Sequence, residues 1–69
     1  MLLEIEFFRR TSAEPAGKTV RRHVADFPSQ KESESYGLSN RPDEADGFRI
    51  YDTGILRKTI SVRPETHDA

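Results

Sequence analysis

The chain has no cysteine, no tryptophan and no long apolar run. Without cysteine no disulfide can stabilise the fold, and the composition is compatible with a reducing cytoplasm. No segment approaches the roughly 20 consecutive apolar residues that a membrane-spanning helix needs. The two glutamates within residues 1–8 do not fit a signal peptide. We therefore expect a cytoplasmic protein with no membrane contact.

Apolar residues are scarce as well. They make up 33% of the 69 residues, and charged residues make up another 33%. A chain of this length predicts one small domain, residues 1–69, with a thin core. Small domains with thin cores usually need a disulfide, a metal or a partner for stability. We expect a partner: another protein or a homo-oligomer of this chain.

Short alternating apolar segments lie at both ends of the chain. Leu3, Ile5 and Phe7 alternate with other residues, and a period of two is typical of a half-buried strand. The pattern predicts strands at about 2–9, 18–27, 48–52 and 55–63, with a polar acidic connector at 28–47 and a polar tail at 64–69. The predicted fold class is mainly β or small α+β, an antiparallel sheet of three to four strands with room for one short helix in the connector.

Residues 18–27 allow two interpretations. Ala16, Val20, Val24 and Phe27 are spaced like one stripe of a helix. The β-branched side chains of the segment favour a strand instead. Strand is the favoured prediction, and helix stays open.

The connector contains one helix signal. Ser29 followed by Glu32 is a capping-box pattern, and Gly37 is a typical helix end. The pattern predicts a short helix over 30–36, whereas residues 37–47 are rich in turn formers. Whether the connector is ordered stays open. The predicted core is Leu3, Ile5, Phe7, Val20, Val24, Phe48, Ile50, Leu56, Ile60 and Val62.

No motif indicates catalysis or a bound metal. Gly17-Lys18-Thr19 matches only the end of a phosphate-binding loop, because position 12 is serine where that loop needs its first glycine. The two histidines, His23 and His67, are too few and too far apart for a zinc site of three or four ligands. We expect no catalytic residue, no cofactor and no metal, and we expect that the protein is not an enzyme.

Basic and aromatic side chains are predicted to share the sheet face opposite the core. They are Phe8, Arg21, His23, Arg49, Tyr51 and Arg57. Cations between aromatics are typical of sheets that bind single-stranded nucleic acid. However, Glu4 and Glu6 lie on the same predicted face, and the pI of about 6.1 is far below the value of about 9 usual for such domains. Cross-strand ion pairs of these glutamates with Arg21 or Arg57 are the simpler interpretation.

The connector is acidic, because residues 27–47 carry five acidic and two basic side chains. Such a loop can dock on a basic protein surface by charge complementarity. The sequence thus favours a non-enzymatic accessory, regulatory or inhibitory subunit that docks on a larger macromolecule through a sheet edge, by strand addition, or through a charged surface. The candidate partner-binding residues are Arg21, Arg22, Tyr51 and Arg57 on the sheet, and Asp43, Glu44 and Asp46 on the connector. The alternative is a weak single-stranded nucleic-acid-binding module that uses Phe8, Arg21, Arg49, Tyr51 and Arg57.

Overall fold

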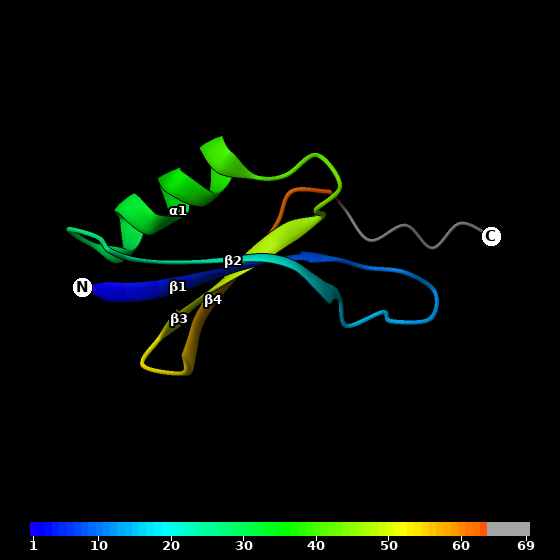
Figure 1. Ribbon diagram of the computed structural model, residues 1–69, viewed down its shortest axis with the longest axis horizontal. Coiled ribbons are helices and arrows are strands. Elements are labelled where there is room, and N and C mark those ends of the chain that lie inside the picture. The colour runs from blue at the N-terminus through cyan, green and yellow to red at the C-terminus, as the bar shows by residue number, and fades with distance from the viewer. Residues whose placement is uncertain (64–69) are drawn as a thin grey trace.

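The computed structural model describes residues 1–63, which form a four-stranded antiparallel sheet with one helix on one of its faces (Figure 1). The elements in chain order are β1 (Leu2–Arg9), β2 (Lys18–Asp26), α1 (Gln30–Asn40), β3 (Gly47–Asp52) and β4 (Ile55–Ser61). The strand order across the sheet is β2-β1-β3-β4, so β2 and β4 are the edges. The predicted fold class is confirmed, and residues 18–26 are a strand. The predicted tail, residues 64–69, lies outside the described part of the chain.

The register places apolar residues of the two central strands opposite one another. Ile5 of β1 lies opposite Ile50 of β3, and Phe7 lies opposite Phe48. A two-residue hairpin joins β3 to β4, and both of its residues, Thr53 (φ 49°) and Gly54 (φ 81°), have the positive φ that such turns favour.

Each edge strand contains one bulged residue. In β2, Arg21 pairs with Phe7 and Thr19 with Phe8, so that Val20 is the extra residue. In β4, Lys58 pairs with Ile50 and Leu56 with Tyr51, so that Arg57 is the extra residue. A bulge shifts the strand by one position and exchanges the two faces beyond it.

The core lies between the sheet and α1. Its buried residues are Leu3, Ile5, Phe7, Phe27, Ala45, Phe48 and Ile50. The helix approaches the sheet closely because Ser33 and Gly37, both buried, are small. A Cβ atom at Gly37 would lie 2.8 Å from Cδ2 of Phe48, closer than side chains tolerate. Glycine is required here by the close approach.

The helix begins where the sequence predicts and ends later. Ser29 caps α1, and its Oγ accepts a hydrogen bond from the Glu32 N–H at 3.3 Å. Gly37 does not end the helix, because it packs against Phe48 within it. The predicted range of 30–36 is therefore too short. Beyond α1, the Arg41 side chain donates to the Ala45 carbonyl at 2.6 Å and closes the turn that leads into β3.

Part of the predicted core is wrong. Val24, Leu56 and Val62 are exposed, and Val20 and Ile60 are half-buried. The bulge at Arg57 turns Leu56 to the face opposite α1. In β2, Ala25 rather than Val24 lies opposite Leu3 on the side of the helix. Buried apolar residues that the predicted core lacks are Phe27 and Ala45 in this core, and Phe8 on the opposite face of the sheet.

Candidate interaction surface

Within residues 1–63, no strand pairs with the outer edge of β2. This free edge presents backbone groups at alternate residues, and the pairing of β2 with β1 shows which ones. The Met1 amino group donates to the Phe27 carbonyl, and the Phe27 N–H donates to the Met1 carbonyl, both at 2.7 Å. In an antiparallel ladder, pairs that exchange both bonds alternate with pairs that exchange none. Counting back from Phe27, the residues whose amides and carbonyls face β1 are Ala25, His23 and Arg21. The residues whose amides and carbonyls face away from the sheet are Arg22, Val24 and Asp26.

An independent contact supports this alternation. The Asp46 N–H, next to β3, donates to the Phe8 carbonyl at 2.8 Å. The backbone N–H and C=O groups of the even-numbered residues of β1 thus point toward β3, and those of the odd-numbered residues point toward β2. Ile5, which lies opposite His23, belongs to the second set.

The three outward-facing residues of this edge of β2 carry side chains of three different kinds. Val24 lies opposite Glu4 and Arg22 lies opposite Glu6, on the sheet face away from α1, and Asp26 continues the row. The Val24 side chain is exposed, with 57% of its surface accessible. Arg22 contacts Glu4 and Glu6 at the long distances of 3.5 and 3.4 Å. Asp26, 82% exposed, accepts from the Met1 amino group through Oδ1. Along this edge a cation (Arg22), an apolar side chain (Val24) and an anion (Asp26) therefore follow one another.

The other edge is less open to pairing. The bulge at Arg57 interrupts β4 near its middle, and Lys58 adds a second cation beside it. Bulges and lysines are common protections of sheet edges. By the same alternation, Thr59 and Ser61 are the residues of β4 beyond the bulge whose amides face outward. In β2 the bulge lies near the start, so residues 21–26 run uninterrupted.

Glu6 occupies the centre of the sheet face that α1 leaves open. Its Oε2 accepts from the Thr19 hydroxyl at 2.8 Å and from Arg22 at 3.4 Å. Its Oε1 accepts from the Tyr51 hydroxyl at 3.1 Å and from Arg49 at 3.2 Å. All four partners come from the neighbouring strands, so this cluster ties β2, β1 and β3 together.

The pKa shifts follow from this environment. Burial, the largest influence, raises the pKa of Glu6, but the hydrogen bonds from Thr19, Arg49 and Tyr51 and the Arg49 charge outweigh it, so the pKa is lowered. Burial and the hydrogen bond to Glu6 raise the pKa of the Tyr51 hydroxyl. At neutral pH Glu6 is thus an anion and Tyr51 a proton donor, which is the combination that holds the cluster together.

Phe8 lies on the same open face but is fully buried. The guanidinium groups of Arg10 and Arg49 lie over its ring, 4.7 and 4.3 Å from the centroid. Arg49 also donates to the Ala16 carbonyl in the loop between β1 and β2. This is a cation–π arrangement, and it leaves the ring of Phe8 unavailable for stacking on a base.

The predicted basic and aromatic face is therefore only partly assembled. Arg49 and Tyr51 lie on the open face, as predicted. The prediction is wrong for Arg21 and His23, because Arg21 pairs with Phe7 on the α1 side and His23 stacks on Tyr36 with 4.5 Å between ring centroids. The predicted ion pairs also have other partners, since the glutamates contact Arg22 and Arg49.

The four candidate sheet residues do not form one patch. Arg21 and Arg22 lie on opposite faces of the β2 edge, and Tyr51 is held by Glu6 at the sheet centre. Arg57 lies on the far edge, where it contacts Asp52 at 3.6 Å. Of the four, Arg22 is the one that belongs to the outward-facing row.

The candidate acids of the connector also separate. Asp46 has internal partners, because its carboxylate accepts from the Arg10 N–H at 2.7 Å and from Arg63 at 3.2 Å. It thereby fastens the start of β3 to the chain just after β1 and just after β4. Asp43 and Glu44 are exposed.

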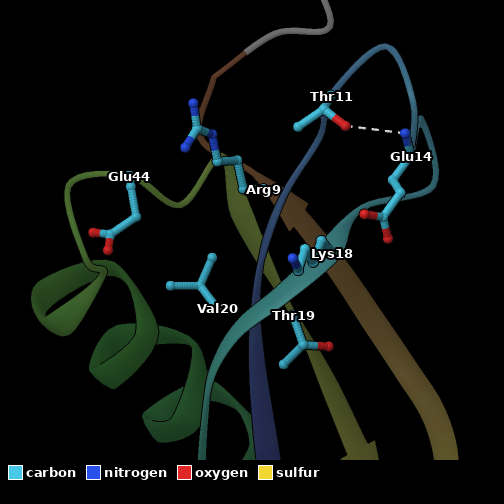
Figure 2. A pocket seen from close by; sticks show the side chains of 7 residues that line it. All are labelled: Arg9, Thr11, Glu14, Lys18, Thr19, Val20 and Glu44. Carbon is cyan, nitrogen blue, oxygen red and sulfur yellow. Dashed lines mark hydrogen bonds between the residues drawn. The ribbon is translucent and has the colours of Figure 1, made fainter.

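Glu44 lines an open pocket of about 400 Å³ at the end of the sheet where the β1–β2 loop begins (Figure 2). The lining residues are Arg9, Thr11, Glu14, Lys18, Thr19, Val20 and Glu44. Figure 2 shows Glu44 on the connector side and Glu14 on the loop side, where its backbone N–H donates to the Thr11 hydroxyl at 3.0 Å. Because cations and carboxylates are mixed, the lining favours no one class of ligand.

Within residues 1–63, no three His, Cys, Asp or Glu side chains come together in a way that would hold a metal ion. In the same part of the chain, no helix has the length and apolar character that spanning a membrane requires.

Val24 and Asp26 are not among the binding residues that the sequence predicts. The signal that would have identified them is the alternation Arg22-His23-Val24-Ala25-Asp26, read as the outward row of an edge strand. The sequence prediction places Val24 in the core, which conflicts with a place in this row.

Comparison of the chain with protein-family models, with curated proteins and with solved structures finds no match.

Proposed function

We propose that the protein is a non-enzymatic interaction subunit of the cytoplasm that binds an extended segment of a larger protein at the free edge of β2. The observation that carries this proposal is the uninterrupted edge from residue 21 to 26, with outward backbone groups at Arg22, Val24 and Asp26. Strand addition uses such main-chain groups for affinity and the flanking side chains for specificity. A partner segment that is bound to β2 in this way cannot make other contacts, so binding gives the protein an accessory, regulatory or inhibitory role.

The side chains of the edge define the chemistry of the partner. In an antiparallel arrangement the partner residue opposite Asp26 comes first along the chain, and the one opposite Arg22 comes last. Opposite charges in directly facing positions stabilise a strand pair, and like charges destabilise it. The preferred partner segment therefore reads basic, any residue, apolar, any residue, acidic.

Val24→Pro tests the proposed edge. Proline has no N–H, and the N–H of Val24 faces outward, so the β1–β2 ladder keeps its bonds and the fold tolerates the change. The partner loses one hydrogen bond and meets the proline ring. We expect partner affinity to fall by about tenfold or more, since about 1.4 kcal/mol corresponds to a factor of ten.

The measurement is affinity capture from the native host followed by mass spectrometry, and then titration calorimetry with the identified protein. Thr59→Pro is the matched control, because it removes an outward N–H from the opposite edge. A partner retained by Thr59→Pro and lost by Val24→Pro supports the proposal. A partner that binds both variants as it binds the parent protein refutes it, as does salt-sensitive oligonucleotide binding in place of protein binding.

A further inference from the structure

The segment that the β2 edge prefers is present in this chain, in β2 itself. Arg22-His23-Val24-Ala25-Asp26 reads basic, any residue, apolar, any residue, acidic. Resting on the proposed function of this edge, we propose that β2 pairs antiparallel with β2 of a second copy, in the register that places Val24 opposite Val24. In the dimer the same edge is thus occupied by a second copy of the protein, and a twofold axis relates the two copies.

The backbone groups meet correctly in this register. Arg22, Val24 and Asp26 are the residues whose amides and carbonyls face outward. With Val24 on the axis, Arg22 lies opposite Asp26 of the second copy. Every facing pair in this row then consists of two outward-facing residues, which is the arrangement in which both backbone bonds are exchanged.

The side chains are complementary as well. On the face away from α1, Arg22 and Asp26 of each copy meet Asp26 and Arg22 of the other, on either side of the two Val24 side chains. On the other face, His23 lies opposite Ala25. No like charges face each other directly. An isologous interface requires this kind of self-complementarity.

Other registers lack it. Sliding the second strand by two residues removes both ion pairs, because Arg22 or Asp26 then faces Val24. Sliding it by four residues places Arg22 opposite Arg22 of the second copy, or Asp26 opposite Asp26. Like charges in facing positions are destabilising, so the charges select the register centred on Val24.

Such pairing joins two sheets into one, with both copies of α1 on the same side. The outer edge of β2 is available for it, since α1 packs over the central strands β1 and β3. A second copy and a partner segment use the same edge and exclude each other. Docking on a larger protein then requires the dimer to dissociate.

Sedimentation equilibrium of the purified chain tests the dimer. An edge of this size predicts a weak reversible dimer with a dissociation constant between about 1 µM and 1 mM. In the dimer of Arg22→Asp, or in that of Asp26→Arg, residues 22 and 26 carry the same charge and face each other at both ends of the paired segment. Each variant is therefore expected to weaken the dimer at least tenfold. An equimolar mixture of these two variants restores opposite charges at both positions, so the mixed dimer is expected to form with the affinity of the parent protein.

Val24→Lys provides a test with no internal salt bridge at risk. This change places two cations on the twofold axis. We expect the variant to be monomeric in sedimentation equilibrium and to keep the fold of the parent protein in circular dichroism. A parent protein that stays monomeric up to about 1 mM overturns the proposal, as does a dimer that Val24→Lys leaves intact or that the mixture fails to restore. If the chain is monomeric but Val24→Pro still abolishes capture of a partner, the dimer is refuted and the proposed function stands. If dimerisation is confirmed and partner capture is insensitive to Val24→Pro, the proposed function fails alone.

Discussion

Phe8→Ala is expected to lower the free energy of unfolding by about 3–5 kcal/mol, the usual cost of removing a buried phenylalanine ring. The ring is fully buried, between Arg10 and Arg49 on one sheet face. A 69-residue domain has a total stability of roughly 3–10 kcal/mol, so this one change brings the protein close to unfolding. Thermal unfolding followed by circular dichroism should show the midpoint falling by more than about 15 °C.

Leu2→Ala is the matched control for this experiment. Leu2 is on the same strand and the same sheet face, but 63% of its surface is exposed. Its replacement is expected to change stability by less than about 0.5 kcal/mol. Equal and small effects of the two substitutions would show that Phe8 is not enclosed by the loop and the two arginines.

Glu6→Gln is expected to destabilise the protein by about 1–3 kcal/mol at pH 7, because it leaves Arg49 and Arg22 without their buried anion. The contribution of Glu6 depends on pH. Its folded-state pKa lies below the ordinary value of 4.5, so the contribution is fully present above that value and is lost as the pH falls through the folded-state pKa. The difference in the free energy of unfolding between the parent protein and Glu6→Gln should therefore shrink as the pH is lowered below 4.5. Urea unfolding at several pH values measures this difference.

Glu4→Gln serves as the control, because Glu4 is the more exposed glutamate and its one ion pair within residues 1–63 is the contact with Arg22 at 3.5 Å. An exposed ion pair of this kind contributes less than about 1 kcal/mol. A Glu6→Gln variant as stable as Glu4→Gln, or a stability difference that grows on acidification, would contradict the role assigned to the Glu6 cluster.

The strands were predictable because their residues alternate. Leu3, Ile5 and Phe7 have a period of two, and β1 has the predicted bounds. The helix start was predictable from Ser29 and Glu32, whose hydrogen bond is local. Its end was not, because Gly37 looks like a helix stop and is instead required by contact with Phe48, which lies on a strand that comes later in the chain.

The two bulges account for much of the remaining error. A strict period of two places Leu56 with Ile60 on one face, but the extra residue at Arg57 separates them. Phe8 was misplaced for a different reason. Its position in the alternation indicates the open face, and this is correct, but the loop that buries it is fixed by tertiary contacts of Arg49 that no local pattern encodes.

The proposed site agrees only in part with the sequence prediction, and both stay untested. A sheet edge is one of the two predicted kinds of docking surface, and Arg22 is one of the predicted residues. Val24 and Asp26 are not, since the outward row depends on which edge is free and on the phase of the β1–β2 ladder. Both are tertiary properties.

Amide hydrogen exchange of β2, resolved by residue with NMR in a sample dilute enough to be monomeric, tests the central claim most directly. Protected amides are those bonded within the fold. The account predicts that the amides of Arg21, His23 and Ala25 exchange about tenfold or more slowly than those of Arg22, Val24 and Asp26. The reverse pattern, or equal rates across the strand, would contradict it.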